Sequence, residues 1–149
     1  MKRSLLGFIV FVLFGGAAHG AERCSNAILN GTYSLYANGT VIGVGPVGLV
    51  AVLKYDGRST LTGIVFQRVN GNIVQFTVTG TYSVDSNCIY TDTTFASTGQ
   101  TATHTAVVAD KGNEFYSLNM TPSPANVIVG VGKRQFPSNG RDNGRDNDR

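Results

Sequence analysis

The chain has 149 residues, of which 42% are hydrophobic and 14% are charged, and its formal net charge is +3. This length accommodates one domain. Lys2 and Arg3 belong to an N-terminal segment that we expect to be removed, which leaves 10 basic and 9 acidic residues and a net charge of +1. Such a balance excludes an extended basic face, so we expect no nucleic-acid partner.

The first twenty residues have the layout of a secretory signal peptide. Lys2 and Arg3 precede an apolar run over residues 5–14, and small residues follow over 15–20. The run is too short to cross about 30 Å of hydrocarbon as a helix. We therefore predict cleavage after Gly20, export to the periplasm or the extracellular space, and no stable membrane insertion afterwards. The alternative is a retained N-terminal anchor.

Two cysteines, Cys24 and Cys88, remain after cleavage. Paired cysteines are the usual state in an exported chain, so we predict a disulfide between them. Two free thiols or a metal site are the alternatives. A metal site is disfavoured because two isolated cysteines lack the short ligand spacing that zinc needs.

Residues 21–135 read as a single β domain. Between residues 74 and 84, apolar and small residues alternate with polar ones, which is typical of a strand with one wet face. No segment after the signal peptide shows a helical repeat. Nine candidate strands lie at about 31–37, 40–44, 47–55, 59–69, 73–84, 88–95, 101–109, 114–120 and 126–134.

Turn signals separate these strands. Asn38-Gly39, Asn70-Gly71 and Asp56-Gly57 are each typical of a type I′ hairpin turn. Short connections make successive strands antiparallel neighbours, and closure removes the open edges of such a meander. We therefore predict an all-β, antiparallel up-and-down barrel of about eight strands, with a two-sheet β-sandwich as the alternative.

One polar group could lie inside the barrel. Tyr90 and Asp92 share a face of one predicted strand, and His104 shares the apolar face of the next. These three residues are our candidate ligand-binding site. A hydrogen-bonded core or rim histidine is the alternative for His104, and Tyr90 and Asp92 could instead face solvent. The same three residues would carry an isomerase-like activity if the protein were an enzyme.

No other constellation points to catalysis. The sequence has no nucleophile elbow, no metal-ligand pair and no phosphate-binding loop. We therefore expect no enzyme activity, no metal and no cofactor. Residues 136–149 are polar and repeat Gly-Arg-Asp-Asn, which predicts a disordered tail, with a tether or an interaction tail as the alternative.

A spaced pattern gives a resemblance. Cys24, Gly31-Thr32-Tyr33, Asp56-Gly57, the stretch from Gly80 to Cys88 and a late Gly132-Lys133-Arg134 resemble small exported bacterial proteins of unknown function. The predicted barrel also resembles the calycins, which include lipocalins and avidins, and the allene oxide cyclase barrel. In calycins an early G-x-W ring packs under a late Arg or Lys. The resemblance assigns these places to Tyr33 and Arg134, although this chain has no Trp.

These observations together favour a non-enzymatic exported barrel. The calycin resemblance implies that it binds a small hydrophobic ligand, and a protein partner at the barrel end is equally compatible. A filled barrel with a structural or surface antigen-like role is one alternative. An isomerase-like enzyme that uses Tyr90, Asp92 and His104 is the other.

Overall fold

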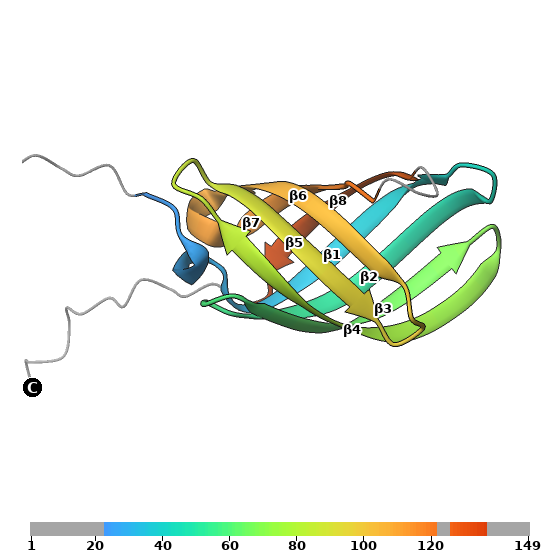
Figure 1. Cartoon of the computed structure of the whole chain (residues 1–149), viewed down its shortest axis with the longest axis horizontal. Helices are drawn as coiled ribbons and strands as arrows, with labels where there is room; N and C mark the ends of the chain where they lie inside the picture. Colours follow the sequence, from blue (N-terminus) through green and yellow to red (C-terminus); the bar gives the residue numbers. More distant parts are fainter. Residues whose placement is uncertain (1–22, 122–125, 137–149) are drawn as a thin grey trace, which may run out of the picture.

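The computed structural model describes residues 23–121 and 126–136, and these residues form one closed barrel (Figure 1). Each strand pairs antiparallel with the next, and β8 pairs with β1. The predicted up-and-down barrel is therefore confirmed, and the sandwich alternative is wrong. The strands are β1 (Asn30–Val41), β2 (Gly45–Asp56), β3 (Thr60–Val69), β4 (Asn72–Val84), β5 (Ile89–Ala96), β6 (Thr101–Ala109), β7 (Glu114–Asn119) and β8 (Asn126–Arg134).

Two short 3₁₀ helices, η1 (Asn26–Ile28) and η2 (Asp110–Gly112), accompany the strands. Across residues 23–121 and 126–136, no helix has the length and apolar character needed to cross a membrane. The predicted signal peptide, and the predicted tail beyond Phe136, lie outside the described residues.

The register of the strands fixes the width of the barrel. A path can be traced from each residue to the one directly opposite it on the next strand. The path that starts at Ser83 on β4 returns to β4 at Ile73 after one circuit of the barrel, which is ten residues away. Eight strands with such a stagger leave an interior that side chains just fill, or that holds one small ligand. The width therefore does not decide whether the lumen is filled.

The predicted turn at Asn38-Gly39 is wrong. Both residues lie within β1, which merges two of the predicted strands, and Gly39 pairs with Val47 on β2 and Ile128 on β8. A Cβ atom at Gly39 would lie 1.9 Å from the carbonyl oxygen of Val127. Glycine is therefore needed here for the close approach of two strands rather than for a turn. The connection between β1 and β2 lies at residues 42–44 instead.

The other two turn predictions have different outcomes. Asn70 and Gly71 both have positive φ, 44° and 87°, which confirms the predicted type I′ geometry between β3 and β4. The β2–β3 connection is in the predicted place but of another type, because Gly57 has positive φ and Asp56 does not. The Asp56 carboxylate instead accepts hydrogen bonds from the backbone N–H groups of Arg58, Ser59 and Thr60.

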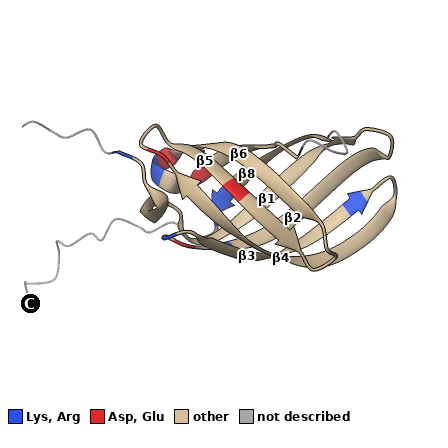
Figure 2. Cartoon of the chain, in the orientation of Figure 1, with Lys and Arg blue, Asp and Glu red and all other residues tan. Residues whose placement is uncertain are grey.

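The two ends of the barrel differ. The plugged end, on the left in Figure 1, carries the N-terminal segment, η1, η2 and the connections after β2, β4 and β6. The hairpin end, on the right, carries the connections after β1, β3 and β5. Charged residues gather at the plugged end, and near the right-hand hairpins the described part of the chain has only the charge of Arg68 on β3 (Figure 2).

Candidate functional site

Tyr90, Asp92 and His104 meet on the inner face of the wall. Asp92 on β5 lies directly opposite His104 on β6, and Tyr90 is two residues before Asp92 on the same face. The Tyr90 hydroxyl donates to Oδ2 of Asp92 at 2.5 Å, and Nδ1 of His104 lies 2.7 Å from Oδ1. Tyr90 is buried, and the Asp92 side chain is only 7% exposed. The alternative in which Tyr90 and Asp92 face solvent is therefore wrong.

Asn119 on β7 completes this group and fixes the tautomer of His104. The Asn119 Oδ1 atom accepts the backbone N–H of Thr121 at 3.0 Å, which leaves the amide nitrogen facing Nε2 of His104 at 3.2 Å. An amide nitrogen only donates, so Nε2 accepts and the ring proton sits on Nδ1, where it is donated to Asp92. We call Tyr90, Asp92, His104 and Asn119 the polar chain.

The sequence interpretation missed Asn119, although a signal for it exists. Alternation along the predicted strand 114–120 places Asn119 on the same face as Phe115 and Ser117, and Phe115 is buried in the core. An inward asparagine in a narrow barrel needs polar partners. The pairing of Asn119 with His104 could not be derived from periodicity, because it depends on the register between β6 and β7.

Burial controls the chemistry of the polar chain. Desolvation is the main cause that raises the pKa of Tyr90 far above its ordinary value, and the nearby Tyr55 and Asp92 raise this pKa further. The phenol therefore remains a hydrogen-bond donor throughout the physiological pH range. Both carboxylate oxygens of Asp92 and both ring nitrogens of His104 have partners within the protein. His104, whose side chain is 29% exposed, is the member that a ligand could reach.

Five aromatic rings fill the barrel next to the polar chain, and we call them the aromatic plug. Tyr55 is at its centre, with ring centroids 5.1–6.1 Å from four neighbours, and its hydroxyl lies 3.3 Å from that of Tyr90. Edge-to-face and offset contacts of this kind stabilise aromatic clusters beyond the area that they bury. The plug consists of Tyr33, Tyr55, Tyr82, Tyr90 and Phe115, all of which are buried.

Arg134 covers the outer side of the plug. Its guanidinium carbon lies 4.9 Å from the Tyr33 ring centroid, a cation–π arrangement. The same group donates to the carbonyl oxygens of Ile28, Asn30 and Gly112, and Nε donates to Oδ1 of Asn113. Tyr33 and Arg134 thus lie together at the barrel end.

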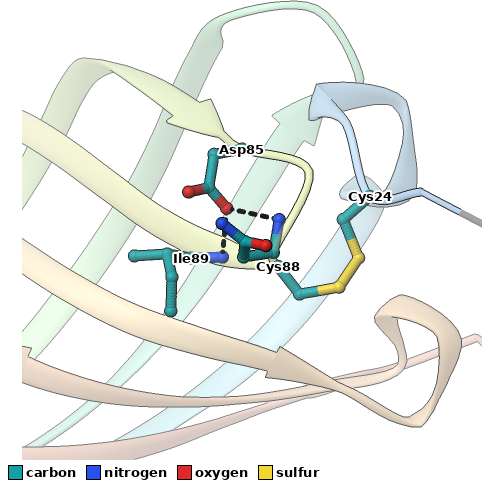
Figure 3. Close-up of a disulfide and its surroundings, with 5 residues drawn as sticks. Cys24, Asp85, Cys88 and Ile89 are labelled. Carbon is teal, nitrogen blue, oxygen red and sulfur yellow. Dashed lines mark hydrogen bonds between the residues drawn. A yellow bond between two sulfur atoms is a disulfide. The ribbon is translucent and has the colours of Figure 1, made fainter.

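A disulfide holds the N-terminal segment against the same end. Cys24 and Cys88 are bonded with their Cα atoms 5.0 Å apart, and they join the segment before η1 to the β4–β5 connection (Figure 3). Cys88 has a φ of 64°, and the turn that presents it is held by the Asp85 carboxylate, which accepts the N–H groups of Asn87 and Ile89. The two alternatives for the cysteines, free thiols and a metal site, are not observed.

The hairpin end has the opposite character. Val74 faces inward yet is 40% exposed, and the inward Leu49 and Phe76 are also partly exposed. Apolar side chains also surround this end from outside, where Ile42 and Ile73 are 59% and 75% exposed. Apolar surface inside the barrel is therefore accessible from this end, whereas the plug fills the other.

Neither a metal cluster nor a known relative narrows the function. Among the described residues, no three His, Cys, Asp or Glu side chains lie close enough to hold a metal ion. Two shallow hollows, of about 410 and 320 Å³, lie on the outer wall, and none of the residues that line them belongs to the polar chain. No protein family model matches the chain, and no curated protein is similar enough to match it.

Proposed function

We propose that the protein is an exported, non-enzymatic binding protein that takes a small, mainly apolar molecule into the hairpin end of its barrel. The observation that carries this proposal is the apolar inner surface of that end, where Val74 is exposed and Phe76 and Leu49 are partly exposed. Burying such surface against an apolar ligand contributes about 25 cal/mol per Å². The disulfide between Cys24 and Cys88 is compatible with an oxidising, exported location.

The polar chain supports a role in orienting the ligand. Binding sites for small molecules are mainly apolar and hold a few polar groups that fix orientation. His104 is partly exposed and lies deeper in the barrel than Val74, between the aromatic plug and the hairpin end. A ligand hydroxyl that displaced the Asn119 amide could donate a hydrogen bond to Nε2 of His104. A ligand carbonyl could instead accept a hydrogen bond from the Asn119 amide.

The same contacts argue against an isomerase. A general base needs a lone pair within reach of the substrate proton, and Nε2 of His104 offers one only to a molecule that displaces the Asn119 amide. Asp92 accepts from both Tyr90 and His104, and the raised pKa of Tyr90 makes its proton hard to remove. The group therefore suits hydrogen bonding to a ligand better than proton transfer.

The calycin likeness belongs to this proposal. Tyr33 under Arg134 reproduces the arrangement of an early ring beneath a late cation. The likeness implies binding of a small apolar ligand, which agrees with the proposal.

A filled barrel with a structural or surface role is the rival, and the aromatic plug favours it. Five buried rings already occupy the interior at one end. The two proposals differ in one measurable respect, because a filled barrel has no saturable site that depends on inward residues of the hairpin end.

Two adjacent residues give a matched test. Val74 faces the lumen and Ile73 faces outward on the same strand, so Val74→Glu places a carboxylate in the entrance and Ile73→Glu places one outside it. The mature protein is titrated with the apolar fluorescent probe N-phenyl-naphthylamine. We expect saturable binding that Val74→Glu weakens about tenfold or more and Ile73→Glu leaves unchanged. Absence of saturable binding, or equal effects of the two variants, would favour the filled barrel.

A further inference from the structure

The outer wall of the barrel carries a row of apolar side chains across five adjacent strands. Directly opposed residues on β7, β8, β1, β2 and β3 are Tyr116, Val131, Tyr36, Val50 and Phe66. Tyr36 is 58% exposed, and Tyr116, Val50 and Phe66 are about half exposed. Leu118 and Val129 extend the row on one side, and Val52 and Ile64 extend it on the other. We call these nine residues the apolar outer face.

The rest of the wall shows that the fold does not require this face. On β4, β5 and β6 two rows of outward positions are polar, with Thr81, Thr93 and Thr103 in one row and Ser83, Thr91 and Thr105 in the next. Beyond them, Val107 and Ile89 continue the row of Tyr116 onto β6 and β5 and are 51% and 40% exposed. Threonine has a high β propensity and also makes the surface hydrophilic. The same barrel therefore carries, beside the apolar outer face, a patch of outward threonine and serine side chains that we call the threonine face.

The extent of the apolar outer face is that of a protein interface. Eight of the nine side chains are 40–58% exposed, and together with the partly exposed Val131 they offer on the order of 800 Å², comparable to one partner's share of a standard interface. The largest apolar patch on a typical monomer is roughly 300–600 Å². The nearest charged groups are Lys133, which lines one of the hollows beside Tyr36, and Glu114, with which Lys133 pairs at 3.3 Å, so their charges are mutually compensated.

The shape around Tyr36 suits a second copy of the same face. Tyr36 lines both hollows on the outer wall, the one shared with Val50 and Phe66 and the one shared with Tyr116 and Leu118. A ring that stands between two hollows can enter a hollow of a partner while the partner's ring enters the corresponding hollow in return. Twofold association requires this kind of self-complementary surface.

We propose that two copies of the chain form a twofold dimer through the apolar outer face, with Tyr36 at its centre. A closed barrel has no free strand edge, so a second copy cannot extend the sheet and must use a face of the wall. The interface lies on the outside and leaves the polar chain and the hairpin end accessible. The dimer is therefore independent of the proposed ligand binding.

Charge substitution at matched outward positions tests the dimer. Tyr36→Glu places a carboxylate in the centre of the apolar outer face, and the control Thr91→Glu places one on the threonine face. Sedimentation velocity of the mature full chain is measured over a wide concentration range. We expect a dimer for the native chain and for Thr91→Glu, and an increase of about a hundredfold in the dissociation constant for Tyr36→Glu.

A milder variant guards against misfolding. Val50→Thr combined with Phe66→Thr copies the threonine face, keeps the β preference, and should also weaken the dimer while circular dichroism stays unchanged. A native chain that is monomeric at every concentration, or equal behaviour of Tyr36→Glu and Thr91→Glu, would overturn the proposal. Monomers that bind phosphatidylcholine vesicles through this face would overturn it too, in favour of a lipid surface.

Discussion

Replacing Gly39 with alanine tests how the barrel closes. A Cβ atom there would lie 1.9 Å from the carbonyl oxygen of Val127, and ordinary van der Waals contact begins near 3.4 Å. Strands β1 and β8 would have to separate locally by the difference, about 1.5 Å, which is more than a backbone hydrogen bond tolerates. Two lost ladder bonds with their buried groups left unpaired cost about 2–5 kcal/mol.

Gly48 is the matched control. It lies on β2 opposite Asn38, and a Cβ atom there meets nothing within 4 Å. Gly48→Ala should therefore be neutral or stabilise the fold by about 0.4–1 kcal/mol, because alanine lowers the conformational entropy of the unfolded chain. Urea unfolding of both variants, followed by tyrosine fluorescence with the disulfide intact, gives the two free energies of unfolding. Free energies that agree within about 1 kcal/mol would refute the close approach at the β1–β8 seam.

Three further predictions concern the plugged end and its connections. Replacing Cys24 and Cys88 with serine should lower the free energy of unfolding by about 4 kcal/mol, because the bridge closes a loop of 64 residues, and a change below about 1 kcal/mol in urea unfolding would contradict this. Burial raises the pKa of Tyr82 to about 12 and also raises the pKa values of Tyr55, Tyr90 and Tyr33, so a phenolate absorbance titration should show Tyr55, Tyr82 and Tyr90 still protonated near pH 11. Because these pKa values are higher in the folded state, the protonated tyrosines contribute their full stabilisation below pH 10.0, and this contribution is lost as the pH rises further. Titration of all tyrosines near their ordinary pKa without unfolding would contradict this prediction. The hydrogen bonds from Thr60 and its neighbours hold the pKa of Asp56 well below its usual 3.8, so stability should fall as the pH drops below that value, and Asp56→Asn should flatten this fall in denaturant titrations at several acid pH values.

Alternation along single strands predicted much of the fold and part of the site. The inward position of His104 follows from local periodicity, because it shares a face with Ala102, Ala106 and Val108. The run around Tyr90 and Asp92 alternates less clearly, so the sequence placed these two residues on one face but left open whether that face is the inner one. The Asn70-Gly71 turn was also predictable, since its geometry is set by two adjacent residues.

Features that depend on distant strands could not be predicted. The pair Asn38-Gly39 has the local signature of a turn, and only the approach of β8 explains its place inside β1. Asn119 meets His104 through a register that no periodicity reveals. The apolar outer face was hidden as well, because continuous apolar runs such as Leu49 to Leu53 give no indication of which side chains face outward.

The seam between β1 and β8 has a kinetic consequence. It joins residues about a hundred positions apart, since Tyr33 lies opposite Arg134. Contacts this distant in sequence slow folding, because the chain must search for its final pairing before the gain from that pairing is realised. A polypeptide that emerges from one end cannot close this ring until its last strand has appeared.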